Sequence, residues 1–413
     1  MKSDRWKSVP IRRLGELVGG GTPVAKAEYW DGEVPFATPP DLRPVIGGVV
    51  HATQRTVTAE GAAAGSSTVP AGSVLLSIRA PIGYVARTAT VMSFSQGCRA
   101  IVPFKGTEAS YLTYALVAAG AELTSLGRGT TFMEVSAAQL AALEVPVPPQ
   151  DEQRAIADYL DRETARIDTL IEEQQRLIEM LGERRDAVIA EAATKGVRAG
   201  VALVESGVEW IGAIPERWSV KALRRCGTLL TGSTPPTNDR GNFAEEANER
   251  PWVRPQDLSS ATTASAWLTP QGWSHLRPVP AGSVLVGCIA YSLGSVGYLP
   301  VPATTNQQIT SVVPTEVDGR YLYYVLHATK SELWAASQMN RVPILNNQRL
   351  GAIQIPVPPV DEQRLIAEYL DEQTAKIDRT KAESERLVEL ARERRAALIT
   401  AVVTGQIDVR ERV

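Results

Sequence analysis

VPVPPQDEQRAIADYLDRETARID, at residues 145–168, returns 210 residues later as IPVPPVDEQRLIAEYLDEQTAKID, at residues 355–378. Seventeen of the 24 aligned positions are identical, so chance similarity is excluded. The residues that precede each copy agree far less. The chain therefore consists of two halves, each with a variable block followed by a nearly constant block.

The constant blocks predict two long helices. Each block begins with a proline pair, Pro148-Pro149 or Pro358-Pro359, and continues with an acidic pair, Asp151-Glu152 or Asp361-Glu362. Proline is excluded from a helix interior, and acids in the first turn face the positive end of the helix dipole. The stretch that follows is poor in Gly and Pro, and it predicts helices of about 40 residues.

Apolar residues at seven-residue spacing predict that these two helices form a coiled coil. The spacing holds for Leu160, Ile167, Leu181 and Val188 in the first helix and for Leu370, Ile377, Ala391 and Leu398 in the second. A polar residue takes the middle position of each series, Gln174 and Ser384, either to fix the register or by chance substitution. Since the first helix leads into the second variable block, pairing within the chain requires antiparallel helices and a pseudo-twofold molecule.

The variable blocks predict mixed α/β domains. Short apolar runs alternate with Gly and Pro, as in VPAGSVLLSI from Val69 and VPAGSVLVGCI from Val279, which is typical of strands and turns. Each block also has a predicted helix near its end, at 111–119 and 321–329. The predicted fold class is α+β, with two mixed α/β domains separated by two long antiparallel coiled-coil helices in a pseudo-twofold internal repeat.

The predicted segments follow the chain in order. They are a first domain at 1–145, a long helix at 146–196, a Gly-rich irregular connector at 197–214, a second domain at 215–355, and a second long helix with a C-terminal tail at 356–413.

Charge and cysteine content narrow the function classes. The variable blocks carry +2 (1–149) and +3 (215–359), whereas the constant blocks carry −5 (150–196) and −2 (360–413). Mildly basic domains suit contact with a polyanion, although ordinary surface charge explains these values equally well. Three cysteines without C-x-x-C spacing indicate neither disulfides nor zinc, and no apolar leader or long apolar run appears, so we expect a reducing cytoplasm.

Motifs for catalysis are missing from the sequence. It has no G-x-x-x-x-G-K-[ST] loop, and His51, His275 and His327 are isolated, without metal-ligand spacing. The run 19–21, Gly-Gly-Gly, lacks the lysine of a phosphate loop and predicts a structural turn. Pro-Pro-Asp-Leu at 39–42 predicts a turn as well. We therefore expect no catalytic or metal site in this chain.

Side chains suited to reading DNA bases occur in both variable blocks. Arginine pairs with guanine edges, and asparagine or glutamine pairs with adenine. The candidates are Arg43, Arg79, Gln96, Arg99 and Arg128 in the first block and Arg254, Gln256, Asn306, Gln307, Gln308, Asn340 and Arg341 in the second. Any one of them alone fits a solvated loop position, so the prediction rests on the set.

Together these features resemble the DNA-specificity subunit of type I restriction-modification systems, over essentially the whole chain. The resemblance rests on the two PVPPxDEQRxIAxYLD segments from Pro146 and Pro356, the connector SGVEWIGAIPERW at 206–218, and the paired P-A-G-S-V-L segments. It implies two target-recognition domains, each reading one half of a bipartite, asymmetric DNA sequence, with helices that set the spacer. It also implies a subunit without a catalytic centre of its own.

The resemblance further implies the partners. They are double-stranded DNA, two methyltransferase (modification) subunits that use S-adenosylmethionine, and, in complexes that contain them, translocase-nuclease (restriction) subunits that use ATP and Mg. No cofactor is expected on this chain, and no membrane. Two alternatives stay open: a nuclease with an unusual site, and a coiled-coil protein-interaction adaptor without sequence-specific DNA reading.

One departure from the repeat concerns the first domain. Only Asp4-Arg5-Trp6 precedes it, whereas the fuller segment 212–218 precedes the second domain. We therefore expect the C-terminal tail, 404–413, to complete the packing of the first domain.

Overall fold

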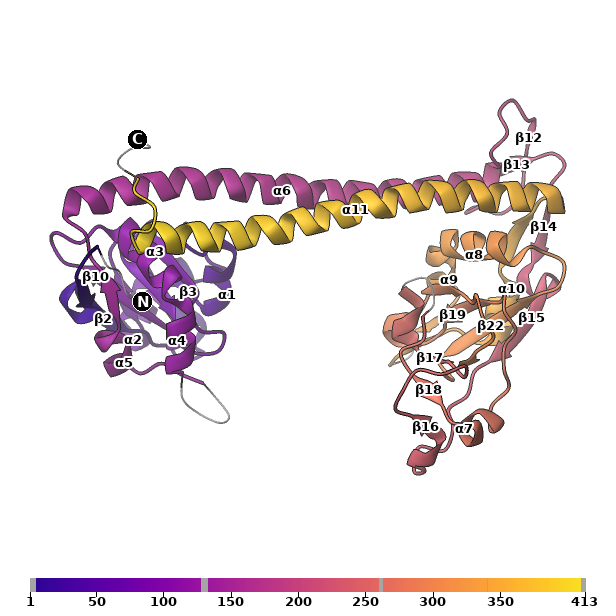
Figure 1. Cartoon of the computed structure of the whole chain (residues 1–413), viewed down its shortest axis with the longest axis horizontal. Helices are drawn as coiled ribbons and strands as arrows, with labels where there is room; N and C mark the ends of the chain where they lie inside the picture. The colour runs from indigo at the N-terminus through magenta and orange to yellow at the C-terminus, as the bar shows by residue number, and fades with distance from the viewer. Residues whose placement is uncertain (1–4, 128–132, 260–262, 340, 410–413) are drawn as a thin grey trace. The chain divides into compact units, whose positions relative to one another are not determined.

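The computed structural model describes residues 5–127, 133–259, 263–339 and 341–409, which form two compact units (Figure 1). The first unit comprises residues 1–175 and 385–413, and the second comprises residues 176–384. Each unit therefore combines one variable block with one end of each long helix. The predicted fold class is confirmed.

Two sheets build the domain of the first unit, in the strand orders β2-β10-β7-β8-β4 and β5-β3-β9-β6. Their strands are β2 (Gly15–Gly19), β3 (Trp30–Ala37), β4 (Val49–Val50), β5 (Arg55–Val57), β6 (Ser67–Val69), β7 (Val74–Ser77), β8 (Val85–Thr88), β9 (Met92–Phe94) and β10 (Cys98–Pro103). A separate pair joins β1 (Ser8–Pro10) to β11 (Glu144–Pro146). The helices are α1 (Pro39–Leu42), α2 (Ala59–Gly65), α3 (Ala109–Ala118), α4 (Gly120–Leu126) and α5 (Ala137–Ala142).

The second unit has a four-stranded sheet in the order β15-β22-β19-β20. Its strands are β15 (Gly227–Thr231), β19 (Val284–Gly287), β20 (Val296–Tyr298) and β22 (Ile309–Pro314). Short pairs surround the sheet: β14 (Ser219–Ala222) with β25 (Gln354–Val357), β16 (Phe243–Ala244) with β18 (Trp267–Leu268), β17 (Trp252–Val253) with β21 (Thr304–Thr305), and β23 (Gln338–Met339) with β24 (Pro343–Ile344). The helices are α7 (Pro270–Ser274), α8 (Gly319–Ala328), α9 (Lys330–Ala335) and α10 (Asn347–Ala352).

Strand pairing shows that the two domains are copies of one fold. β2 pairs antiparallel with β10, as β15 does with β22. The parallel pair of β3 and β9 joins Ala37 to Phe94, and its counterpart of β17 and β21 joins Val253 to Thr305. Positions in the two domains can therefore be compared residue by residue.

The long helices are α6 (Gln150–Lys195) and α11 (Val360–Val403), and each begins directly after its proline pair, as predicted. The shorter predicted helices at 111–119 and 321–329 correspond to α3 and α8. Much of the predicted coiled-coil series is buried: Leu160, Ile167, Leu370, Ile377 and Ala391 are at most 8 % exposed. Burying each leucine or isoleucine contributes about 1.5–3 kcal/mol. Leu160 and Leu370 lie in the cores of the first and second units, so these two positions also anchor the helices to the domains.

Within each unit α6 and α11 run antiparallel, as predicted. In the first unit Arg395 Nε lies 2.8 Å from Asp168 Oδ1. The repeat of this pair lies in the second unit, where Arg185 Nε is 3.0 Å from Asp378 Oδ1. Early residues of one helix therefore contact late residues of the other.

A buried glutamine in the constant block ties α6 to the first domain. Gln153 is 2 % exposed, and its side-chain oxygen accepts a hydrogen bond from the Glu108 amide at 2.9 Å. Its side-chain nitrogen donates to Pro148 O at 2.9 Å. Gln363 makes the same two kinds of bond in the second unit. The repeated glutamine therefore fixes the start of the helix against the start of α3 or α8.

The segment 197–214 differs from the prediction of an irregular connector. It contains β12 (Leu203–Glu205), which pairs with β13 (Ala213–Pro215) as an antiparallel hairpin. Ile211 and Ile214 are 4 % and 3 % exposed and belong to the core of the second unit. The prediction of an irregular segment was wrong because each strand has only three residues, too few to show an alternating pattern.

The C-terminal tail packs on the first unit, as predicted. Val409 is 2 % exposed and belongs to the core of that unit. A Cβ on Gly405, which has φ +79°, would lie 3.2 Å from the Trp6 ring. Asp408 Oδ2 lies 3.1 Å from Arg5 Nη1. The described tail residues therefore complete the packing around Trp6.

Candidate nucleic-acid interface

Backbone hydrogen bonds bring five segments of the first domain together. They are residues 19–22, 37–43, 78–81, 95–97 and 133–135. The bonds, from amide nitrogen to carbonyl oxygen, are Ile78 to Gly97 (2.9 Å), Val135 to Ile78 (2.9 Å), Gly21 to Phe94 (3.1 Å) and Ser95 to Ala37 (2.9 Å). Three of the predicted base-reading residues, Arg43, Arg79 and Gln96, lie in these segments.

The second domain assembles the equivalent segments in the same way. They are residues 232–234, 253–256, 288–292, 306–308 and 341–345. The bonds are Cys288 to Gln308 (2.9 Å), Leu345 to Cys288 (2.8 Å), Ser233 to Thr305 (2.7 Å) and Asn306 to Val253 (2.9 Å). We call the two assemblies the first and second edge. The two edges share these backbone hydrogen bonds but differ in side chains and in one loop: a cis Ala80–Pro81 bond follows Arg79, whereas a 3-10 turn with Ala290 at φ +53° follows Ile289.

Glycines allow the close approach that builds each edge. A Cβ on Gly20 would lie 2.1 Å from Ser95 O, and one on Gly232 would lie 2.2 Å from Asn306 O. Real Cβ atoms do not approach backbone oxygen so closely, so any side chain here would push the two segments apart. The Gly-Gly-Gly run is not the predicted turn: Gly19 ends β2, and Gly20 and Gly21 continue in irregular backbone.

A buried aspartate caps the next segment of each edge. Asp41 accepts a hydrogen bond from the Thr38 amide at 2.8 Å, and Asp257 accepts one from the Arg254 amide at 2.8 Å. Asp41 also accepts from the Gln54 amide at 2.8 Å. The Pro-Pro-Asp-Leu run at 39–42 is therefore the short capped helix α1, where the sequence predicted a turn.

The predicted residues of the first domain differ in exposure. Arg43, Arg79 and Gln96 are exposed, whereas Arg99 is half-buried within β10. Arg79 Nε lies 2.9 Å from Glu134 Oε2. Arg128 lies outside the described residues. Gln96 sits in the turn between β9 and β10, where its neighbour Gly97 receives the Ile78 amide.

Several predicted residues of the second domain bind their own domain. Arg254 donates from Nη2 to Ser265 Oγ at 2.7 Å. With its amide assigned from its hydrogen-bonding neighbours, Gln256 accepts from Arg254 Nε at 3.0 Å. Asn306 donates to Thr234 Oγ1 at 3.2 Å and accepts from the Gln308 amide at 2.9 Å. Direct base contact by Arg254 or Asn306 would require exchange of these bonds.

The other predicted residues of the second domain lie on the second edge. Gln307 and Arg341 are exposed, and Gln308 is half-buried. The Thr234 hydroxyl donates to the Gln307 side-chain oxygen. Asn340 lies outside the described residues. Gln307 corresponds to Gln96, so both turns present a glutamine at the same position.

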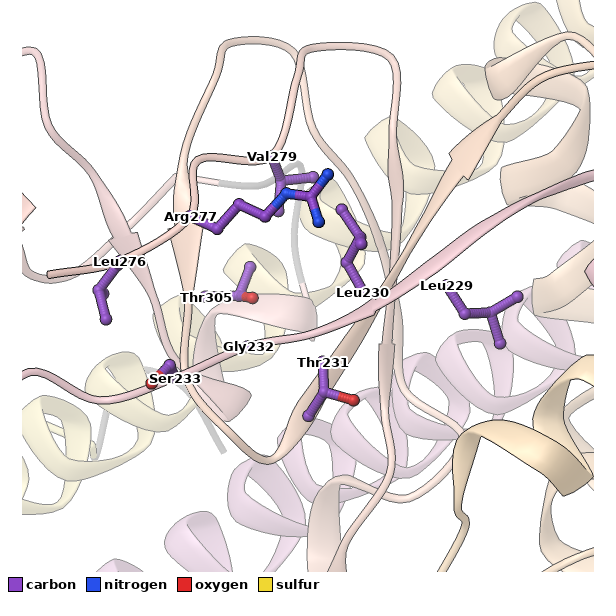
Figure 2. Close-up of a pocket in the computed structure, with 9 residues that line it drawn as sticks. All are labelled: Leu229, Leu230, Thr231, Gly232, Ser233, Leu276, Arg277, Val279 and Thr305. Carbon is purple, nitrogen blue, oxygen red and sulfur yellow. The ribbon is translucent and has the colours of Figure 1, made fainter. Parts of the chain in front are cut away.

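A cavity of about 200 Å³ lies behind the loop 231–233 of the second domain, and Figure 2 shows its lining residues. The Thr305 hydroxyl at this cavity is buried and has no hydrogen-bond partner among the described residues. Phe94 holds the equivalent position in the first domain, where it is fully buried and lies against Gly20. The second domain therefore has the smaller side chain, threonine in place of phenylalanine, at the position where the cavity lies beneath the second edge.

Sequence reasoning missed a second polar anchor, a tyrosine of each domain that hydrogen-bonds an aspartate of the constant-block helix. Tyr114 donates to Asp161 Oδ1 at 2.7 Å, and its hydroxyl lies 3.1 Å from Thr164 Oγ1. Burial and the hydrogen bond to Asp161 raise the pKa of Tyr114, which therefore stays a neutral donor. Tyr324, with Asp371 and Thr374, repeats the arrangement. The repeat of Tyr-Ala-Leu and Tyr-Val-Leu, 210 residues apart, was the signal that marked it.

The cation that faces this aspartate comes from different elements. In the first unit Arg87 of β8 lies 3.2 Å from Asp161. In the second unit Arg320 of α8 lies 2.6 Å from Asp371. Each aspartate thus has an arginine partner, but the two arginines occupy positions that do not correspond between the halves. An alignment of the halves would not predict these ion pairs.

The three cysteines of the chain are buried. Cys98, Cys226 and Cys288 are unpaired and buried, and burial raises the pKa of the Cys98 thiol to about 12. Within the described ranges no group of three or more His, Cys, Asp or Glu residues could hold a metal ion. The helices of those ranges include none with the length and apolar character needed to cross a membrane.

Comparison with known families identifies the class of the chain. Residues 3–180 and again residues 215–389 match the family model described as the type I restriction modification DNA specificity domain. These two matches cover most of the chain, which therefore belongs to this family. The resemblance drawn from the sequence is confirmed, and a coiled-coil adaptor without DNA reading is not favoured.

Curated relatives are specificity subunits of type I restriction enzymes. That of the MjaIX enzyme from Methanocaldococcus jannaschii is 34 % identical over 180 residues, which cover 43 % of this chain and 41 % of the relative. That of EcoR124I/EcoR124II from Escherichia coli is 28 % identical over 177 residues, covering 40 % and 41 %. The matches thus span about two fifths of the length of these two relatives.

Solved structures share the fold over nearly the whole chain. A chain from a study of complex assembly and conformational transition of the type I R-M system gives a TM-score of 0.74 at 17 % identity, covering 98 % of this chain and all of that one. The HsdS subunit from Thermoanaerobacter tengcongensis gives 0.50 at 18 % identity, with 98 % of both chains covered. At these identities the likeness shows the fold.

Proposed function

We propose that this chain is the non-catalytic recognition subunit of a type I restriction-modification complex, and that its two domains read the two halves of a bipartite, asymmetric DNA target. The observation that carries the proposal is the duplicated edge: one backbone scaffold presents different side chains at equivalent positions. Arg79 and Glu134 of the first edge correspond to Ile289 and Ile344 of the second. Since bases are distinguished by donors, acceptors and methyl groups, unlike side chains select unlike half-sites.

The twelve residues predicted from the sequence remain the candidates for DNA contact. Exposure favours Arg43, Gln96, Gln307 and Arg341 for direct contact. The internal bonds of Arg254 and Asn306 favour a positioning role for these two. The Gln307 side-chain oxygen accepts from the Thr234 hydroxyl, so Gln307 would meet a base through its side-chain nitrogen. In such interfaces phosphate contacts set the register and base contacts set the sequence, so the exposed glutamines are the first choice for base reading.

The partners proposed for the chain follow from its family. Two methyltransferase subunits would bind the long helices and carry S-adenosylmethionine, and restriction subunits, where present, would carry ATP and Mg. The acidic constant blocks, at −5 and −2, support protein rather than DNA contact for the helices. The long helices would also set the spacer between the half-sites.

A selection from random duplexes with the assembled methyltransferase complex tests this function. We expect enrichment of two short specified half-sites that flank an unspecified spacer. Gln96→Ala should relax the sequence of one half-site and Gln307→Ala that of the other, each by about 1–3 kcal/mol at the base concerned. Gln175→Ala, on an exposed part of α6, is the matched control and should change neither. No enriched sequence would overturn the proposal.

A further inference from the structure

The two edges differ in chemical character at one matched pair of positions. In the first edge Arg79 and Glu134 face each other as an isolated antiparallel bridge and form an ion pair at 2.9 Å. In the second edge the same bridge joins Ile289 to Ile344. A charged pair has therefore been replaced by two isoleucines at the same backbone bridge, and the loop that follows the first residue of the bridge also differs between the edges.

Exposed apolar side chains lie close in sequence to the isoleucine pair, with Tyr291 two residues after Ile289 and Val342 two residues before Ile344. Tyr291 is 74 % exposed, Val342 is 40 % exposed and Ile344 is 39 % exposed. We call Tyr291, Val342 and Ile344 the apolar patch. Such a group of exposed apolar side chains next to polar rim residues marks an interaction site.

The loop that carries Tyr291 is rigidly built. The Ser292 hydroxyl donates to Ile289 O at 2.8 Å, and Ser292 is 2 % exposed. A Cβ on Gly287 would lie 2.1 Å from Ser292 O, so the loop closes tightly on β19. Ala290 adopts φ +53°, a left-handed conformation that costs a non-glycine residue about 1 kcal/mol. The fold thus holds the exposed Tyr291 next to a residue with strained backbone, Ala290. Strained backbone of this kind is frequent at functional sites.

Charge identifies the partner of the apolar patch. The contributing segments, 287–296 and 337–349, contain no Asp or Glu but include Arg341 and Arg349. The patch also adjoins the glutamine turn, because the Cys288 amide donates to Gln308 O at 2.9 Å and the Leu345 amide donates to Cys288 O at 2.8 Å. Exposed apolar side chains on segments whose charged residues are all basic fit the DNA major groove, where the one apolar group on a base edge is the C5-methyl of thymine.

We propose that the second domain reads thymine through its C5-methyl group, with Tyr291, Val342 and Ile344 as the specificity-determining contacts. The first domain has an ion pair at the matched position and reads its half-site there through polar groups. This inference rests on the proposed function and names the base that the second edge recognises.

Duplexes with deoxyuridine in place of thymidine test the proposal, because they lack only the methyl group. The selected target is synthesised with each thymidine replaced in turn, and its binding to the assembled methyltransferase complex is measured. We expect one or more thymidines, all within a single half-site, at which the replacement weakens binding about fourfold, the effect of removing one buried methyl-sized group.

Variants of the chain assign that effect to the apolar patch. In Tyr291→Ala or Ile344→Ala the deoxyuridine penalty should vanish at those thymidines, while Leu203→Ala should leave it unchanged. Leu203 is a matched control because it is 48 % exposed and lies on the β12–β13 hairpin of the same unit. These side chains are exposed, so the substitutions leave the folded domain intact.

The outcomes separate the two proposals. Absence of any enriched target would overturn the proposed function. An enriched target with no thymine in either half-site would overturn the thymine proposal alone. So would a deoxyuridine penalty that persists in both Tyr291→Ala and Ile344→Ala.

Discussion

Replacing Gln363 by leucine tests whether the buried glutamine holds α11 to the second domain. Gln363 is 1 % exposed; its side-chain oxygen accepts from the Asp318 amide at 2.7 Å, and its side-chain nitrogen donates to Pro358 O at 2.8 Å. Leucine is close in volume but makes neither bond. A buried carbonyl and the amide of a helix N-cap residue would lose their partners together.

The magnitude follows from the burial of these groups. An unsatisfied buried polar group costs about 1–3 kcal/mol. Pro358 is buried, whereas Asp318 is half-buried, so its amide regains part of its hydration from water. The added apolar burial of leucine offsets about 1 kcal/mol. We expect a net loss of about 2 kcal/mol in the free energy of unfolding of the second unit.

Urea unfolding, with hydrogen exchange followed on peptides of α8, measures this loss. Gln153→Leu should cost about as much in the first unit and raise exchange in α3 instead. Gln175→Leu, at an exposed position of α6, is the control and should stay within about 0.5 kcal/mol of the parent. If Gln363→Leu also stayed within that range, the glutamine would not be an anchor and the reasoning would fail.

Four other predictions concern stability and spacing. Burial and the Arg185 cation lower the pKa of His327, whose Nε2 lies 3.2 Å from Arg185 Nη1. The folded state then binds fewer protons than the unfolded chain, so the second unit should lose stability as pH falls below about 6.5, and His327→Phe should abolish this loss in urea titrations. Thr305→Val removes an unpartnered buried hydroxyl and should raise the free energy of unfolding by about 1 kcal/mol in urea titrations. Truncation after Thr404 removes the buried Val409 and should cost the first unit about 2 kcal/mol or more; an unchanged melting curve would contradict this. Insertion of one heptad into both α6 and α11 adds about 10 Å of helix, so selection should return the same half-sites with a spacer about 3 bp longer.

The elements of the fold were predictable where a local pattern decides them. Each long helix starts where a proline pair meets an acidic pair, and its core is the seven-residue apolar series. These signals are local in sequence, so they survive without knowledge of the tertiary structure. The hairpin of β12 and β13 was not predictable, because two strands of three residues carry too few alternating positions to distinguish them from a turn.

The candidate interface was predictable only in composition. The glutamine turns were found because an arginine, asparagine or glutamine in a variable loop suits base edges. Asn306 donates its side-chain amide to Thr234, and Arg254 donates to Ser265. These hydrogen bonds depend on tertiary contacts that no local sequence pattern shows. Tyr291 gave no signal at all, since an aromatic residue in a short apolar run predicts a strand and burial, not a 74 % exposed side chain.

Burial explains why one set of positions repeats between the halves and another does not. Gln153 and Gln363 are 2 % and 1 % exposed and hydrogen-bond backbone groups at the helix starts, so folding itself selects glutamine there. The Arg79 and Glu134 side chains are 44 % and 38 % exposed, and an ion pair so open to solvent contributes at most about 1 kcal/mol. In the isoleucine pair at the same bridge Ile344 is 39 % exposed, whereas Ile289 is partly buried against the core of the second unit. Stability therefore requires little of Arg79, Glu134 and Ile344, and a requirement for reading different bases is sufficient to decide which side chains occupy these exposed positions.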